Sequence, residues 1–398
     1  MSRHPAGAGP AAAPSGAAGP APVRQCPAFP TPSPHPAADL RPHRTHREAH
    51  MTMTSQDAPV EGLGAPALLE GARAAVEPEL RAAVETLPRP IRRVARYHLG
   101  WADEHGAPAA TGGGKAIRPA LVLAAARALG ADPLGAVCPA VAVELVHNFT
   151  LLHDDVIDED PTRRHRPTAW AVFGVPDAII TGDAMLSLAV RLLAADPLPT
   201  AGAAVARLTE CVIELCAGQQ ADCAFEDRPP EAVTLDEVLA MATAKTGALL
   251  GTSCALGALY AGAGDEAVAA LDAFGREAGL AFQLIDDLIG IWGDPGRTGK
   301  PAGADLAAHK KSLPVVAALA SGTEAAEELA ELYRHPMDER AVRRAAAAVE
   351  RAGGRDWAQA AAAERMAGAM DGLARAVPDV AAADDLLALA EFVTRRTR

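Results

Sequence analysis

From about residue 63 to the C-terminus, apolar residues recur at helical spacing almost without interruption, and Gly, Pro and Asp punctuate the pattern. No strand-rich segment and no repeat of fixed period is present. The predicted helices cover residues 65–86, 116–130, 134–158, 176–194, 200–224, 235–259, 265–292, 313–332, 338–352, 356–375 and 380–396. Because short loops join long helices, neighbours are expected to run antiparallel, which predicts an all-α fold built as one large antiparallel helical bundle.

The charge of the chain limits the classes of ligand it can bind. Its formal net charge is -13, and a globally negative protein repels nucleic acid and acidic membranes. We therefore expect no nucleic-acid partner. An anionic ligand would have to be met by local basic residues or by metal ions.

Three sequence features bear on location. Six cysteines form no C-x-x-C pair and mostly lie in apolar helical patterns, as buried thiols do in a reducing compartment. No basic region followed by an apolar region opens the chain, so we expect no secretory signal and a cytoplasmic protein. Residues 246–264 carry no charge but are rich in small residues, which predicts a buried central helix and no membrane span.

Residues 1–60 differ in composition from the rest, with Pro, Ala and Gly dominating and scattered Arg and His. Such a segment cannot bury enough apolar surface to offset the entropy of ordering it. We predict a disordered N-terminal extension at 1–60 and one folded domain at 61–398.

The first acidic cluster ends the predicted helix 134–158. Asp154 and Asp158 are spaced i, i+4, which places them on one helix face about 6 Å apart along the axis. Asp155 lies about 100° around the helix from Asp154. Like charges at the negative pole of a helix repel unless a cation binds there, and carboxylate oxygens are ligands that Mg²⁺ accepts together with phosphates. A solvated acidic helix end is the alternative.

A second acidic cluster, Asp286 and Asp287, again ends an apolar helix, within FQLIDDLIGIWGD (282–294). If the two clusters face each other across one cavity, three or so divalent ions between them would form a positive site for a diphosphate. Basic residues recur beside both clusters, as the capture of an anion by a negative protein requires.

Taken together, these motifs resemble those of the trans-isoprenyl (polyprenyl) diphosphate synthases. The match runs in order through GGGKAIRP (112–119), ELVHNFTLLHDDVIDEDPTRR (144–164), AKTG (244–247), FQLIDD (282–287) and GKPAGADLAAHKKSLP (299–314). The resemblance implies the isoprenoid synthase bundle with a central cavity, a homodimer, and a transferase that extends allylic prenyl diphosphates with isopentenyl diphosphate.

The resemblance also assigns roles by position. Mg²⁺ ions, about three of them, are implied to bind the allylic diphosphate through Asp154, Asp155, Asp158, Asp286 and Asp287. The diphosphate of isopentenyl diphosphate is implied to contact Lys115, Arg118, His147 and Arg164. The allylic diphosphate is implied to contact Arg163, Lys245, Lys300 and Lys310. Thr246 and Gln283 are implied to lie beside the reacting carbons.

Three residues depart from the family pattern. Gly290 stands where the second acidic motif usually has a third aspartate, Ala116 replaces a frequent arginine, and His165 replaces a glycine after the arginine pair. Glycine has no side chain to bind a metal. We expect these departures to weaken metal or substrate affinity without abolishing activity.

Product length is expected to depend on the residues before Asp154. Phe149 is about 7.5 Å down the helix axis and is the predicted floor of the cavity, while Thr150 is small enough to let a chain pass. This pattern resembles that of geranylgeranyl diphosphate synthases, with farnesyl diphosphate as the alternative product.

Three further alternatives remain at this point. A class I terpene cyclase also carries an aspartate motif on a bundle, although it does not need the isopentenyl site. A non-catalytic partner subunit would retain the fold without the activity. Residues 1–60 resemble the leaders that direct some terpenoid enzymes into encapsulin-type protein shells.

Overall fold

The Ala- and Leu-rich stretches form helices in the computed structural model, which describes residues 64–109, 114–294, 302–377 and 379–394. The α-helices are α1 (Ala65–Glu85), α2 (Arg89–His98), α3 (Ile117–Ala128), α4 (Val137–Ile157), α5 (Ala169–Phe173), α6 (Val175–Ala194), α7 (Ala201–Glu226), α8 (Leu235–Ala242), α9 (Ala248–Tyr260), α10 (Asp265–Trp292), α12 (Ala304–Ala307), α13 (Leu313–Leu319), α14 (Glu324–Leu332), α15 (Glu339–Arg351), α16 (Gly354–Ala376) and α17 (Val380–Thr394). The shorter elements are η1 (Pro133–Ala136), η2 (Pro230–Ala232), the π-helical η3 (Thr243–Gly247), and the strands β1 (Thr162–Arg163) and β2 (Arg166–Pro167), which pair as a hairpin. The all-α prediction is confirmed.

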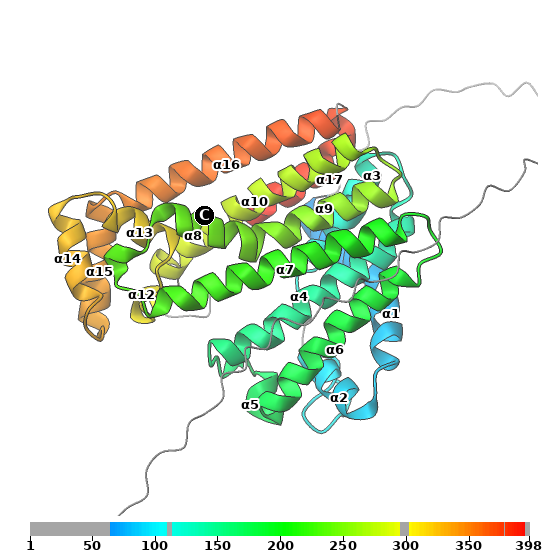
Figure 1. Ribbon diagram of the computed structural model, residues 1–398, viewed down its shortest axis with the longest axis horizontal. Helices are drawn as coiled ribbons and strands as arrows, with labels where there is room; N and C mark the ends of the chain where they lie inside the picture. Colours follow the sequence, from blue (N-terminus) through cyan, green and yellow to red (C-terminus); the bar gives the residue numbers. More distant parts are fainter. Residues whose placement is uncertain (1–63, 110–113, 295–301, 378, 395–398) are drawn as a thin grey trace, which may run out of the picture. The chain divides into compact units, whose positions relative to one another are not determined.

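The long helices pack in a continuous series, with α4 against α6, α6 against α7, α7 against α9, α9 against α10, and α10 against α16 (Figure 1). Glycines allow α9 and α10 to approach backbone to backbone. A Cβ atom on Gly275 would lie 2.5 Å from the carbonyl oxygen of Leu250, and one on Gly279 would lie 2.8 Å from the Cα of Gly247. Any side chain there would force the two segments apart, so these glycines hold the middle of α10 close to α9 and the residue before it.

Helix α9 is the buried central helix that the uncharged segment predicted, since every residue from Ala248 to Ala258 is buried. Among the described residues, a different stretch, Pro133–Ile157, is long and apolar enough by length and composition to cross a membrane. In the structure 56% of its most apolar window is buried inside the protein. The last turn of this stretch also holds the buried residue Asp155. Both observations are typical of a core helix in a bundle.

The structure corrects one predicted helix and adds several short elements. The stretch 313–332 is two helices, α13 and α14, because Gly322 takes a positive φ of 67° and the Thr323 side chain accepts a hydrogen bond from the Ala326 N–H and starts α14 anew. Helices α2, α5 and α12 and the hairpin were not predicted from the sequence. The disorder and the domain boundary predicted for residues 1–60 lie outside the described residues.

Candidate active site

The first acidic cluster lies in the last turn of α4, where Asp154 and Asp155 precede Asp158, the C-cap residue. Burial increases from Asp158, which is exposed, through Asp154 to Asp155, which is 1% exposed. Burial raises the pKa of Asp154 to about 6, while the nearby ammonium of Lys245 opposes the shift. The helix end thus holds carboxylates that are costly to ionise without an added cation.

The second acidic cluster lies near the end of α10, and its two members differ. Asp286 is exposed, whereas Asp287 is buried and both its oxygens accept hydrogen bonds. The backbone N–H of Leu313 donates to one oxygen at 2.9 Å, and Nε2 of Gln283 donates to the other at 2.8 Å. Burial, the largest cause, raises the pKa of Asp287 to about 7. Asp287 therefore ties α10 to the start of α13, while Asp286 remains on the helix surface.

Two lysines, Lys245 and Lys310, interact electrostatically with carboxylates of the acidic clusters. Nζ of Lys245 lies 2.5 Å from a carboxylate oxygen of Asp222 on α7, and the same ammonium influences Asp154 on α4. Burial alone would lower the pKa of Lys310, but nearby carboxylates outweigh it and raise that pKa. They come from four different elements: Asp305, Asp222, Asp287 and Asp158. The end of α4 and the end of α10 therefore share one electrostatic environment.

Lys245 and Thr246 lie in the π-helical segment η3, between α8 and α9. A π-helical turn widens the helix locally and is frequent at functional sites. Gly218 on α7 permits close approach, because a Cβ atom there would lie 2.6 Å from the backbone nitrogen of Lys245. The hydroxyl of Thr246 donates to Oε1 of Gln283 at 2.8 Å. Gln283 in turn donates to Asp287, so the predicted residues Thr246 and Gln283 are in contact.

A basic cluster lies nearer the middle of α4 and consists of Arg118, His147 and Arg164 around Glu144. Burial, reinforced by the positive charges of Arg118 and Arg164, lowers the pKa of His147 well below its usual range. Burial also raises the pKa of Glu144, against the opposing effect of Arg118. Nε of Arg118 is buried and has no hydrogen-bond partner. The cluster thus combines desolvated cations with a neutral imidazole.

Lys115 and Arg164 come together at the start of α3. A Cβ atom on Gly114 would lie 3.0 Å from the guanidinium of Arg164, so Arg164 lies against the backbone next to Lys115. Nζ of Lys115 lies 5.9 Å from the ring centroid of Phe392 on α17. Lys300 lies outside the described residues.

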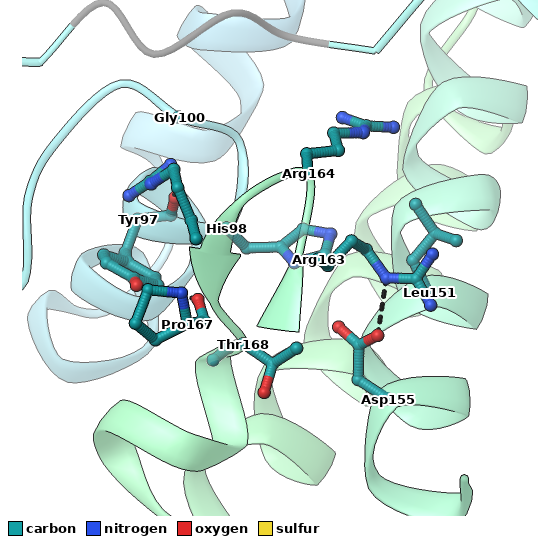
Figure 2. A pocket seen from close by; sticks show the side chains of 11 residues that line it. Tyr97, His98, Gly100, Leu151, Asp155, Arg163, Arg164, Pro167 and Thr168 are labelled. Atoms are coloured by element: carbon teal, nitrogen blue, oxygen red, sulfur yellow. Dashed lines mark hydrogen bonds and ion pairs between the residues drawn. The ribbon is translucent and has the colours of Figure 1, made fainter. Parts of the chain in front are cut away.

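The β1–β2 hairpin carries the arginine pair between the acidic and basic clusters. Nε of Arg163 donates to Oδ1 of Asp155 at 2.5 Å, an interaction drawn as a dashed line in Figure 2. A small pocket opens at this hairpin, lined by residues of α2, α4 and the hairpin that include His98, Asp155 and Arg163. Figure 2 shows the His98 ring extending from α2 toward Arg163 and Leu151.

Phe149 and Thr150 lie on different faces of α4. The Phe149 ring makes an edge contact with the His153 ring, with centroids 4.8 Å apart, and His153 Nε2 lies 3.1 Å from the carbonyl oxygen of Ile179 on α6. Thr150 is four residues before Asp154 and is buried, with its hydroxyl bonded to the His147 carbonyl. Phe149 therefore packs toward α6, and Thr150 lies one turn below Asp154.

Two residues of this region, Asp222 and His98, were not predicted from the sequence. Asp222 follows Gly218 by four residues, and only the contact with Lys245 reveals it. His98 lies in a helix that was not predicted, and its Nε2 is buried without a hydrogen-bond partner. Burial is the largest cause that lowers its pKa to about 3, followed by Arg164 and Arg163.

Comparison with known proteins identifies the family of this chain. Residues 101–350 match the model of the polyprenyl synthetase family. The chain is 52% identical to the geranylgeranyl diphosphate synthase of Mycobacterium tuberculosis, over 83% of this chain and 93% of that protein. It is 46% identical to a (2E,6E)-farnesyl diphosphate synthase of the same species, over 86% and 94%.

Among solved structures, a polyprenyl synthetase from Streptomyces coelicolor A3(2) superposes with a TM-score of 0.79 at 45% identity, covering 82% of this chain and 98% of that one. The matched residues include both acidic clusters and the arginine pair of the hairpin. The chain belongs to the polyprenyl synthetase family and is a prenyltransferase.

Proposed function

We propose that the protein condenses isopentenyl diphosphate with allylic diphosphates head to tail, and that its main product is geranylgeranyl diphosphate. The observation that carries the proposal is the position of Lys310, whose ammonium is influenced by Asp158 at the end of α4 and by Asp287 on α10. A diphosphate bound there would meet both acidic clusters and a cation. The relative of M. tuberculosis named geranylgeranyl diphosphate synthase supports the choice of product.

The two diphosphates would bind on different sides of the hairpin. Isopentenyl diphosphate would be held by the basic cluster together with Lys115, since desolvated cations favour an anion at close range. The allylic diphosphate would be held at the acidic clusters, with Arg163, Lys245 and Lys310 as the cations; Lys300 is proposed for the same role. Arg163 and Arg164 are adjacent in sequence, which would keep the two substrates close.

The acidic clusters fit Mg²⁺. Oδ2 of Asp155 is buried and has no hydrogen-bond partner, and burial raises the pKa of Asp154, Asp155 and Asp287. No group of three or more His, Cys, Asp or Glu among the described residues is arranged to hold a metal ion by itself. This suits an ion that takes one or two carboxylates and fills its remaining positions with diphosphate oxygens and water. About three ions would bind through Asp154, Asp155, Asp158, Asp286 and Asp287.

The side chains of this site would promote ionisation of the allylic C–O bond. When bound, Mg²⁺ would neutralise charge that develops on the departing diphosphate. Lys245 and Lys310 would stabilise the same charge from fixed positions. Thr246 and Gln283 face each other through their hydrogen bond near η3, where they would line the path between the two substrates. No side-chain nucleophile is required, because the double bond of isopentenyl diphosphate attacks the carbocation, and the new cation then loses a proton to the departed diphosphate to restore a double bond.

Thr150 and Phe149 would control product length. Thr150 lies one turn below Asp154 and is small, so a growing chain could pass it toward Phe149. Phe149→Ala is expected to lengthen the main product, measured by chromatography of the dephosphorylated prenols. An unchanged length would show that another residue forms the floor, and a shorter wild-type product would favour farnesyl diphosphate, as in the second M. tuberculosis relative.

The assembly and location are also proposals. Ile180 and Ile213 are 50% and 71% exposed on α6 and α7, two helices that pack together, which supports a homodimer through this surface. The described cysteines are free thiols, and Cys211 and Cys254 among them are buried, which supports a cytoplasmic protein. The hypothesis that residues 1–60 direct the enzyme into an encapsulin-type shell rests on composition alone.

The direct test incubates purified protein with isopentenyl diphosphate, each allylic primer and Mg²⁺, and identifies the products. We expect geranylgeranyl diphosphate and no product when Mg²⁺ is removed. A hydrocarbon or terpene alcohol formed without isopentenyl diphosphate would instead indicate a cyclase. Activity that appears only when another protein is added would indicate a partner subunit.

A further inference from the structure

Gly290 leaves a gap on the face of α10 that carries the second acidic cluster. It follows Asp286 by four residues, so both lie on one face of the helix, about 6 Å apart along its axis. Glycine is unfavourable inside a helix by about 0.5–1 kcal/mol relative to alanine. The surroundings of Gly290 in the last turn of α10 give a reason for its presence.

The carboxylate of Asp305 occupies the space that a side chain at Gly290 would take. A Cβ atom built on Gly290 would lie 1.9 Å from Oδ2 of Asp305 and 2.5 Å from its Cγ. Asp305 belongs to α12, which packs on α10 and is anchored by the fully buried Leu306. No side chain at residue 290 can coexist with Asp305 in this position, so the glycine and the aspartate form a matched pair.

The position of Asp305 also joins it electrostatically to the proposed diphosphate site. Among the carboxylates that raise the pKa of Lys310, Asp305 has the largest effect, ahead of Asp222, Asp287 and Asp158. Its negative charge also contributes to the raised pKa of Asp287. Asp305 thus belongs to the same group of charges as the two acidic clusters.

We propose that Asp305 supplies the third carboxylate of the second acidic cluster, reaching from α12 into the space that Gly290 leaves open on α10. It is a positioning residue, which would accept hydrogen bonds from the water shell of a Mg²⁺ ion held by Asp286, since Mg²⁺ usually keeps several of its waters. This inference rests on the proposed function. If Asp305 has this role, Gly290 does not weaken the metal site, because Asp305 on α12 supplies the carboxylate that α10 lacks.

Two alternative roles for the carboxylates near Gly290 lead to different expected results. In the first alternative, Asp294 supplies the third carboxylate. It follows Asp286 by eight residues and also lies near the end of α10. Alternatively, Asp305 serves only the structure, by holding the loop that leads to Lys310, whose backbone N–H donates to the Asp305 carbonyl oxygen at 2.9 Å. That backbone bond does not require the carboxylate.

The test measures Mg²⁺ binding by calorimetric titration in the presence of inorganic pyrophosphate, with thermal unfolding as the check on folding. Asp305→Asn keeps the shape of the side chain, and we expect it to weaken Mg²⁺ binding about 10–100-fold, the usual effect of losing an outer-shell carboxylate. Gly290→Asp combined with Asp305→Ala moves the carboxylate to α10 and should recover most of the loss of Asp305→Ala.

Glu266→Gln, at the opposite end of α10, is the charge-matched control and should bind Mg²⁺ like the wild type. Wild-type binding by Asp305→Asn would overturn the proposal, and so would a folded double variant that binds as weakly as Asp305→Ala. Weakened binding in Asp294→Asn with none in Asp305→Asn would assign the role to Asp294. If Asp305→Asn unfolds, the role of Asp305 is structural and the proposal is wrong.

The same experiment separates this inference from the proposed function. If the wild type binds Mg²⁺ with pyrophosphate but forms no prenyl product, the proposed function is wrong, while the variants still report on Asp305. If the wild type forms product and Asp305→Asn retains full Mg²⁺ affinity, only the inference about Asp305 is wrong.

Discussion

The acidic clusters (the acidic side of the site) lie at the ends of α4 and α10, whereas the basic cluster (the basic side) lies nearer the middle of α4, and the two differ in electrostatic state. At the acidic clusters, burial raises the pKa of Asp154 and Asp287 to about 6 and about 7, so burial makes these carboxyl groups harder to ionise than ordinary aspartates. At the basic cluster, burial lowers the pKa of Arg118 and His147. Carboxylates predominate on the acidic side and cations on the basic side, which indicates that the two diphosphates are held by different means.

The largest effect is expected from Asp154→Asn, which removes a carboxylate from the acidic side. We expect kcat to fall about 10²–10³-fold, because one stabilising contact to the charge of the transition state is lost. The Mg²⁺ concentration for half-maximal rate should rise as well. Asp183→Asn, an exposed residue on α6, removes the same charge and should leave both values near wild type. An active Asp154→Asn with normal Mg²⁺ dependence would contradict the assignment.

Arg164→Gln tests the basic side. Loss of a charge-assisted hydrogen bond of about 1.5–3 kcal/mol should raise KM for isopentenyl diphosphate roughly 10–100-fold. The Mg²⁺ dependence should not change, which distinguishes this side from the acidic one. Arg166→Gln removes a charge from the same hairpin, where Arg166 stacks on Tyr97, and serves as the control. A shifted Mg²⁺ dependence in Arg164→Gln would show that the two sides are not separate.

His98→Gln tests whether the basic side is sensitive to acid. The folded pKa of His98, about 3, lies below its ordinary value of 6.5, so the unfolded chain binds the proton more tightly. This residue therefore lowers stability as the pH falls from about 6.5 toward 3. Between pH 7 and pH 5 the wild type should lose about 1–2 kcal/mol more stability than His98→Gln. Denaturant unfolding at both pH values measures the difference, and equal losses would contradict it.

The sequence predicted the residues whose role follows from local pattern. Asp154, Asp155 and Asp158 could be found because an i, i+4 pair at the end of an apolar helix is visible in one stretch of chain. The unequal roles of Asp286 and Asp287 could not be predicted, because the N–H of Leu313 that binds Asp287 comes from a helix further along the chain.

Residues brought in by packing were missed for the same reason. Asp222 acquires its place only through the close approach of α7 and η3 at Gly218. Asp305 is visible only as the group that fills the gap at Gly290. The π-helical turn at Lys245 also has no sequence pattern of its own, since its residues continue the helical periodicity on both sides.

The smallest effect is expected at the turn of the hairpin, where the two sides meet. Arg164 and His165 both have positive φ, 51° and 62°, as the two central residues of a tight hairpin turn do. A non-glycine residue in this conformation costs roughly 1 kcal/mol, and histidine replaces the glycine that the family pattern has here. His165→Gly should therefore raise the free energy of unfolding by up to about 1 kcal/mol. The greater conformational entropy of glycine in the unfolded chain reduces this gain. It should leave KM and Mg²⁺ dependence unchanged, because the backbone already has the required geometry. A changed KM for isopentenyl diphosphate would show instead that the imidazole of His165 contacts a substrate, and the basic side would then include the turn itself.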